Sequence, residues 1–165
     1  MDFDIRTARE DEYARLGEIT GQAYTGDGLL DLNDDDHYLN VLRDVAGRAA
    51  DGEVLVAVRD GVLLGGVTFA PPGSRLADIA GPHEAEFRML AVTAEARGQG
   101  VGEALVRACA ERARALEGVT ALVLSTQPAM RGAQRIYERL GFVRTPELDW
   151  SPIPQLTLLT YRLEL

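Results

Sequence analysis

The sequence predicts an α/β protein of the α+β kind, in which helices flank a mixed, mostly antiparallel central sheet. Two apolar, β-branched runs, Glu53–Arg59 and Val62–Ala70, are separated only by Asp60-Gly61, which is a strong hairpin signal. Strand-like and helix-like periodicities then alternate along the rest of the chain. The 165 residues, 46% of them hydrophobic, suffice for one complete core, so we expect a single domain over residues 1–165.

The N-terminal part predicts one strand and two helices. Residues 3–7 alternate like a first strand, and the spacing from Thr7 to Glu10 is that of a capping box opening an amphipathic helix. The acidic residues 34–36 suit the positive start of a second helix, for which Gly52 is a reasonable end.

The part after the hairpin predicts the remaining strands and helices. A loop rich in proline and glycine precedes the next strand, and residues 119–125 form a continuous apolar run, typical of a strand in the middle of a sheet. The elements expected are strands over 86–93, 119–125, 142–144 and 156–163, a helix from the glycine-rich turn to Gly118, a helix with Pro128 in its first turn that ends at Gly141, and a loop over 150–154.

Charge and composition exclude several classes of function. The net charge of −9 opposes nucleic-acid backbones, so we expect no nucleic-acid partner. No stretch reaches the ~20 apolar residues of a membrane span, and the start has no leader pattern, so we expect a cytoplasmic protein with no membrane partner. The single Cys109 is interpreted as a small core residue, and His37 and His83 lack metal-ligand spacing, so no metal site is predicted.

A glycine-rich segment carries the first functional signal. Arg97-Gly98-Gln99-Gly100-Val101-Gly102 joins a predicted strand to a predicted helix, so its backbone N–H groups can converge on an anion at the positive end of the helix dipole. Glycines are suitable because a Cβ would hold the chain away from phosphates. No Gly-Lys-Ser or Gly-Lys-Thr follows, and the third glycine of a dinucleotide fingerprint is missing, so both of those motifs are excluded.

The remaining spacing, Arg-x-x-Gly-x-Gly, resembles the acetyl-CoA pyrophosphate loop of the GNAT superfamily of N-acetyltransferases. The later run from Ala133 to Phe142 is similar to the second signature of that family, Ala-x-x-hydrophobic-Tyr-x-x-x-Gly-Phe. The resemblance spans nearly the whole chain and implies a GNAT-like fold with acetyl-CoA as the acyl donor. It departs from the family at Met130, where asparagine is common.

The resemblance also implies which residues bind the donor. The pantetheine arm would run along the backbone of the strand before the loop, where an N–H would polarise the thioester carbonyl. The cofactor-binding residues expected are Leu90, Ala91, Val92, Arg97, Gly98, Gln99, Gly100, Val101, Gly102 and Ala133. Arg131 and Arg135 either meet the phosphates or are solvated.

Two catalytic residues follow from the same resemblance. Tyr137 resembles the general acid that would protonate the departing CoA thiolate; the alternative is one more residue on the apolar face of its helix. Glu86 lies where some relatives place a general base, because a protonated amine cannot attack a thioester. A water chain instead of Glu86 is equally compatible with the sequence.

The function expected is therefore direct transfer of an acetyl group from acetyl-CoA to a primary amine of a small molecule or peptide. The alternative is a non-catalytic GNAT-like module that binds an acyl-CoA or a protein. Five aspartates between the first two helices, Asp27, Asp31, Asp34, Asp35 and Asp36, are either a solvated loop or a surface that favours a cationic acceptor. The sequence leaves the acceptor, the acyl-chain preference and the oligomeric state open, a homodimer included.

Overall fold

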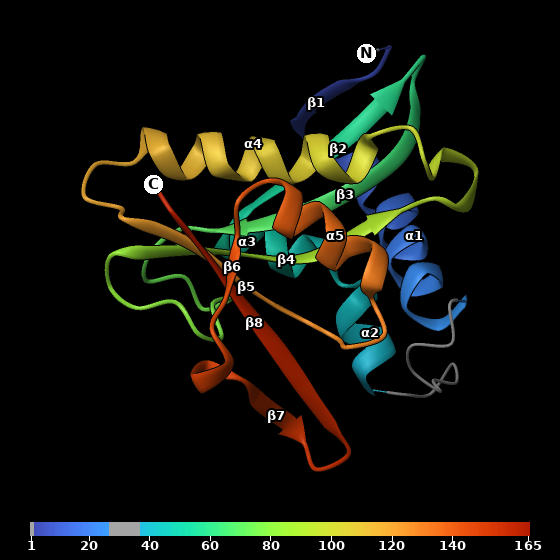
Figure 1. Cartoon of the computed structure of the whole chain (residues 1–165). Coiled ribbons are helices and arrows are strands. Elements are labelled where there is room, and N and C mark those ends of the chain that lie inside the picture. The colour runs from blue at the N-terminus through green and yellow to red at the C-terminus, as the bar shows by residue number, and fades with distance from the viewer. Residues whose placement is uncertain (1, 27–36) are drawn as a thin grey trace.

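The computed structural model describes residues 2–26 and 37–165. These residues form an eight-stranded sheet with helices packed against it, and three short 3-10 helices lie in the connections (Figure 1). In chain order the elements are β1 Asp4–Thr7, α1 Tyr13–Gly26, α2 His37–Arg43, α3 Val45–Asp51, β2 Glu53–Arg59, β3 Val62–Ala70, β4 Glu84–Val92, α4 Val101–Ala115, β5 Ala121–Thr126, α5 Arg131–Arg139, β6 Val143–Arg144, β7 Trp150–Ile153 and β8 Leu156–Glu164.

The strands form one sheet in the order β1-β2-β3-β4-β5-β8-β6, with β7 added to β8. Every neighbouring pair is antiparallel except β4 and β5, which run parallel. The predicted fold class, a mixed and mostly antiparallel sheet flanked by helices, is confirmed. The predicted hairpin has the expected boundaries, and Asp60 and Gly61 both have positive φ (51° and 78°), as a tight two-residue turn between antiparallel strands requires.

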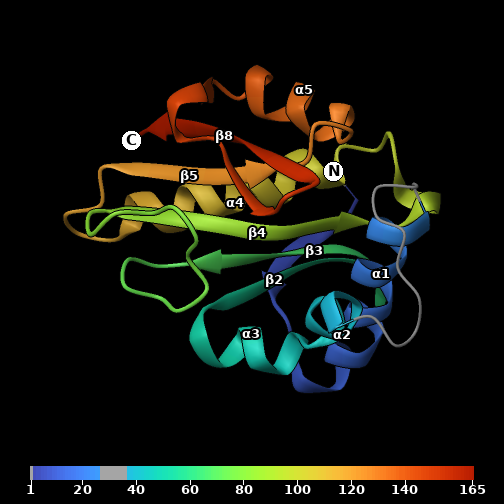
Figure 2. The same cartoon turned by 90° about the horizontal axis from the view of Figure 1, so that it is seen from below.

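Strand β2 shows how the sheet separates two layers of helices. Leu55 and Ala57 pack into a cluster with Leu105 of α4, whereas Val54 and Val56 pack on the other face with Leu16 of α1. Successive side chains of a strand point to opposite faces, so a fully apolar run is buried on both. Helices α4 and α5 consequently lie on one face, and α1 and α3 on the other (Figure 2).

The N-terminal helices differ from the sequence prediction in two ways. The backbone N–H of Arg9 donates to the Glu12 carboxylate at 2.8 Å, and the N–H of Glu12 donates to the Arg9 carbonyl, so the cap lies at Arg9 rather than Thr7. The second helix is interrupted at Asp44, whose side chain accepts from the N–H of Gly47 and begins α3 as a separate helix. A residue that caps a new helix also ends the previous one, because its backbone leaves helical geometry.

The C-terminal part contains two further corrections. Pro128 lies in a turn closed by the Met130 N–H on the Gln127 carbonyl, and α5 begins only at Arg131. The segment predicted as a loop over 150–154 contains strand β7, in which Trp150 pairs with Leu158 of β8 and donates its indole N–H to Ser125. Strand β7 contains Pro152, which a strand at a sheet edge tolerates, and Pro154 lies in the turn that follows. Within the described residues, no helix combines the length and apolar character that crossing a membrane requires.

Candidate active site

The site begins where strands β4 and β5 separate. Their parallel ladder contains three pairs and ends at Glu86 with Val123, although β4 continues to Val92 and β5 to Thr126. Within the described residues, the part of β4 from Leu90 to Val92 therefore has no strand partner on its β5 side. Backbone N–H and C=O groups along that edge are available to pair with an extended ligand.

A β-bulge in β4 shapes the same edge. Gly66 of β3 pairs with Ala91 and Thr68 pairs with Arg88, so Met89 and Leu90 together oppose a single residue of β3. Met89 has a φ of 59°, which is uncommon for a residue with a side chain. The bulge sends Met89 toward Leu42 and Tyr24 on the α1 face, and Leu90 to the α4 face beside the cleft.

The glycine-rich segment lies immediately beyond that edge and begins α4. Gly98 and Gly100 both adopt left-handed conformations (φ of 76° and 83°), and a Cβ built on either would meet no heavy atom within 4 Å. Gly100 is the N-cap of α4 and supplies no capping side chain, so the first-turn N–H groups of the helix receive no cap there. An open glycine turn before uncapped helix amides is a site for an anion.

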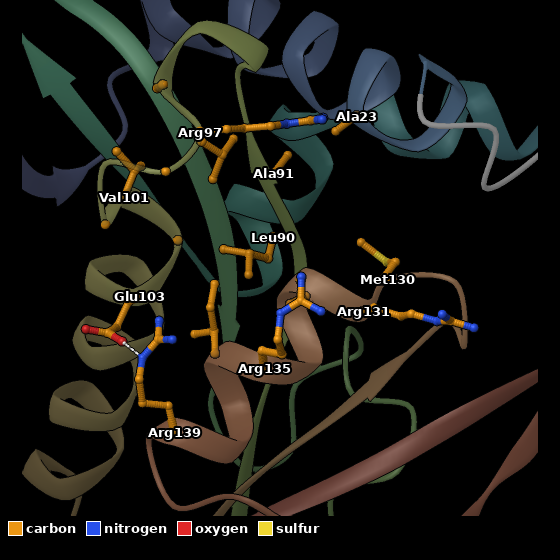
Figure 3. A pocket seen from close by; sticks show the side chains of 18 of the residues that line it. Ala23, Leu90, Ala91, Arg97, Val101, Glu103, Met130, Arg131, Arg135 and Arg139 are labelled. Atoms are coloured by element: carbon orange, nitrogen blue, oxygen red, sulfur yellow. Dashed lines mark hydrogen bonds and ion pairs between the residues drawn. The ribbon is translucent and has the colours of Figure 1, made fainter.

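The unpaired edge of β4 and the glycine turn border the same cleft, whose volume of about 740 Å³ is typical of small-molecule sites (Figure 3). Of the predicted cofactor residues, all except Gln99 line it. The lining comprises Ala23 of α1, Leu90, Ala91 and Val92 of β4, Ala96, Arg97, Gly98, Gly100, Val101, Gly102 and Glu103 of the turn and α4, and Ala129, Met130, Arg131, Gly132, Ala133, Arg135, Ile136 and Arg139 before and in α5.

Four arginines make the cleft suitable for a polyanion. Arg131, Arg135 and Arg139 follow one another at four-residue intervals and therefore lie along one side of α5. Arg139 pairs with Glu103 of α4 at 2.6 Å, an ion pair that holds the pKa of the Glu103 carboxyl below its usual range. Arg97 stretches from the glycine turn across the cleft toward Ala23 (Figure 3).

The side chain of Gln99 turns away from the cleft. Its amide Nε2 donates to the Glu95 carbonyl at 3.1 Å, and its Oε1 accepts from Nη2 of Arg59 at 2.8 Å. Only the backbone of Gln99 remains available to a ligand in the turn.

Tyr137 lies in the hydrophobic core rather than among the residues that line the cleft. It is 3% exposed, and its ring contacts those of Phe87, Phe142 and Tyr161 with centroids 5.7 to 5.9 Å apart. Burial raises the pKa of its phenol well above the usual range, because a phenolate would lose its hydration. The raised pKa keeps this hydroxyl protonated at neutral pH.

Glu86 is fully buried at the end of the β4–β5 ladder and also lies outside the cleft lining. Its Oε1 accepts three backbone N–H groups, from Asp78, Ile79 and Ala80, at 2.9 to 3.0 Å. Its Oε2 has no hydrogen-bond partner among the described residues. Burial raises the pKa of this carboxyl, although the three N–H groups oppose that rise.

The profile of the acetyltransferase (GNAT) family matches residues 14–142. The chain belongs to this family. No curated protein matches the sequence.

Solved GNAT structures share the fold of this chain at low sequence identity. A GNAT-family acetyltransferase from Staphylococcus aureus is 15% identical with a TM-score of 0.77, covering 99% of both chains. A putative acetyltransferase from Salmonella typhimurium with its cofactor acetyl-CoA is 22% identical with a TM-score of 0.73, over 100% of this chain and 95% of that one. A ribosomal-protein-alanine N-acetyltransferase from Brucella melitensis is 23% identical with a TM-score of 0.73, over 98% and 99%.

Sequence reasoning missed several residues of this GNAT cleft. Arg139 and Glu103 were not predicted, although the four-residue spacing of Arg131, Arg135 and Arg139 in the sequence would have placed the three arginines together. Ile136 also lines the cleft, but an apolar residue on a helix face gives no indication in the sequence that it belongs to a binding site. The predicted aspartates from Asp27 to Asp36 lie outside the described residues.

Proposed function

We propose that this protein transfers an acetyl group from acetyl-CoA directly to a primary amine. The observation that carries the proposal is the continuity of one cleft, from the unpaired edge of β4 to the open turn at Gly98 and Gly100. An extended arm fits the strand edge, and a pyrophosphate fits the turn. Membership of the GNAT family gives the same donor.

The residues of the cleft fit acetyl-CoA in charge as well as in shape. The uncapped N–H groups at the start of α4 would hold the pyrophosphate, and Arg135, which points from α5 toward the cleft, would meet further phosphate oxygens (Figure 3). The Arg131 side chain lines the cleft but extends away from the glycine turn, so it would reach only a more distant phosphate. Leu90 to Val92 would bind the pantetheine arm by backbone hydrogen bonds, with one N–H left to stabilise the oxyanion. When bound, acetyl-CoA supplies the activated acetyl group as a thioester.

Tyr137 is proposed as the general acid for the departing thiolate. Its raised pKa keeps the phenol protonated, and an acid must carry its proton before the leaving group departs. Its ring packs against three aromatic neighbours, which fixes the orientation of the side chain. Aromatic packing alone would also explain a tyrosine at this position, and the Tyr137→Phe variant distinguishes a catalytic role from a packing role.

Glu86 is proposed as the general base, acting on the amine through water. Oε1 is occupied by three N–H groups, which leaves the unpartnered Oε2 as the proton acceptor, and burial moves the pKa toward the neutral range in which a base is effective. The test is the pH profile of kcat/KM. Glu86→Gln should remove its acidic limb, and an unchanged limb would assign the base to a water chain alone.

The acceptor is proposed to be an amine of a small molecule or peptide, with a cationic acceptor as the sequence-based expectation from the five aspartates. If these residues attract the acceptor, its kcat/KM should fall as salt rises, because exposed charges are screened beyond about 8 Å. Replacing Asp31, Asp34 and Asp35 with Asn should then raise the acceptor KM and leave the KM for acetyl-CoA unchanged. A neutral preferred acceptor would contradict this expectation.

One assay separates the enzyme from the alternative, a binding module without turnover. The protein is mixed with acetyl-CoA and a panel of amino acids, polyamines, aminoglycosides and peptides with free N-termini, and free thiol is followed. Saturable, amine-dependent release supports transfer. CoA binding by calorimetry without release for any amine would support the binding module.

A further inference from the structure

Arg59, the last residue of β2, reaches the glycine turn from a distant part of the chain. Its Nη2 donates to Oε1 of Gln99 at 2.8 Å and to the Asp2 carboxylate at 2.9 Å. Its Nε is buried and has no partner among the described residues. The guanidinium thus contacts the turn through one nitrogen, which joins the β2–β3 hairpin to the residue in the middle of Gly98-Gln99-Gly100.

Gln99 is held at both ends of its amide. Nε2 bonds back to the Glu95 carbonyl in the 3-10 turn at 94–96, and Oε1 is taken by Arg59. The two flanking glycines have left-handed φ values that a glycine backbone does not retain by itself, because glycine populates positive and negative φ about equally. Backbone hydrogen bonds hold the two ends of the segment, from Arg97 to the Ala94 carbonyl and from Ala104 to the Gly100 carbonyl. The side chain of Gln99 adds the contact that fixes the residue between the two glycines.

We propose that Arg59 is a positioning residue that holds the glycine turn in its anion-binding conformation before acetyl-CoA arrives. The inference rests on the proposed function. Neither the Arg59 nor the Gln99 side chain lines the cleft, so both act through the backbone of the turn. Binding to a turn that is already ordered avoids the entropy cost of ordering it, and this raises affinity without any added contact to the ligand.

The experiment uses the full chain with Arg59→Ala, Gln99→Ala and the double variant. Asp2→Ala is the matched control, because it removes the other partner of Nη2 and leaves the link to the turn intact. Calorimetry with CoA measures affinity. Hydrogen exchange of the amides at 98–102 in the free protein measures the order of the turn independently of activity.

We expect each single variant to weaken CoA binding by roughly three- to tenfold, the scale of one ordinary intramolecular hydrogen bond, and Arg59→Ala to leave kcat unchanged. The double variant should be no worse than either single one, because both break the same link. Exchange at 98–102 should accelerate in all three variants and not in Asp2→Ala. Acetyl-pantetheine, which lacks the pyrophosphate, should keep its KM throughout.

Several results would overturn the inference. They are unchanged CoA affinity in Arg59→Ala, unchanged exchange at 98–102, or an equal loss with acetyl-pantetheine, which would indicate general destabilisation. A wild-type protein that does not bind CoA would reject the proposed function together with this inference. A wild type that binds CoA while the variants bind equally well would reject this inference alone.

Discussion

Two turns of this protein differ in what their backbone N–H groups face: one pairs them with a carboxylate of the chain, and the other leaves them facing an open cleft. In the turn at 78–80, three N–H groups converge on the Glu86 carboxylate, which is fully buried. In the turn at 98–100, the glycines open onto the cleft, and the helix that follows has no capping side chain. The first turn binds a carboxylate of the chain itself, and the second has the form of a site for a ligand.

The comparison gives a physical criterion for a ligand site. A buried backbone N–H group destabilises the folded protein unless it has a hydrogen-bond partner. Several N–H groups that converge on one point are therefore paired with a group of the protein itself or are accessible to water or a ligand. The turn at 78–80 has its partner and orders the loop between β3 and β4. The turn at 98–100 is open to the cleft, where water can pair with its N–H groups, and in the proposed function a phosphate of acetyl-CoA would replace that water.

Adding a side chain to the open turn is the strongest way to test the comparison. Gly100→Val should weaken CoA binding by more than about 100-fold, because the turn must leave its left-handed conformation and the side chain fills the anion space. Calorimetry on the folded variant measures it.

Gly118 provides a matched control for Gly100→Val. It follows α4 with a φ of 81°, and a Cβ there would also meet nothing within 4 Å, but it lies outside the cleft. Gly118→Val should lose about 1–2 kcal/mol of stability from the same backbone strain and keep its CoA affinity. Equal losses of affinity in both variants would mean that strain alone, and not anion space, explains the effect.

The second prediction tests whether Tyr137, which is buried in the core, takes part in catalysis. Tyr137→Phe should lower kcat on the order of 10² and keep the affinity for acetyl-CoA, if the phenol is the general acid. Tyr161→Phe, at a buried ring in the same aromatic cluster, is the control and should leave kcat unchanged. An unaltered kcat in Tyr137→Phe, measured where chemistry limits the rate, would leave Tyr137 as a packing residue.

A third prediction concerns stability and pH in the occupied turn. The folded pKa of Glu86 is raised, so between the unfolded value of 4.5 and that raised pKa the folded state holds a proton that the unfolded state has lost. The unfolding free energy contributed by Glu86 is therefore greatest below pH 4.5 and declines as pH rises through this window. Glu86→Gln does not titrate, so its stability relative to wild type should increase with pH across the window in urea unfolding. A pH-independent difference would contradict the raised pKa.

The smallest expected effect concerns Glu103, a carboxylate that lines the cleft proposed to bind the phosphates of acetyl-CoA. Arg139 and Arg107 partly neutralise it. Glu103→Gln should tighten CoA binding by about two- to threefold at low salt and by less at high salt, because exposed ion pairs contribute little and are screened. Weaker binding would show that the Arg139–Glu103 pair is needed to join α4 to α5.

The sequence was informative where local chemistry decides the conformation. Asp60-Gly61 fixed a hairpin with the right boundaries, and the glycine spacing from Gly98 predicted an open turn at a helix start. The sequence-based prediction was wrong where a contact with another part of the chain decides the conformation. Strand β7 exists because β8 pairs with it, and the second helix divides because Asp44 caps a new one.

The sequence alone therefore determined the fold class, the open glycine turn at 98–100 and the family, because each depends on spacing between neighbours in the sequence. The tertiary structure decided what each site side chain contacts. Arg59 bonds to Gln99 across 40 residues, and Glu86 closes on three amides of the preceding loop. No periodicity encodes such contacts, because they arise only when the sheet brings distant strands and loops together and most buried polar groups then pair with whatever partner lies beside them.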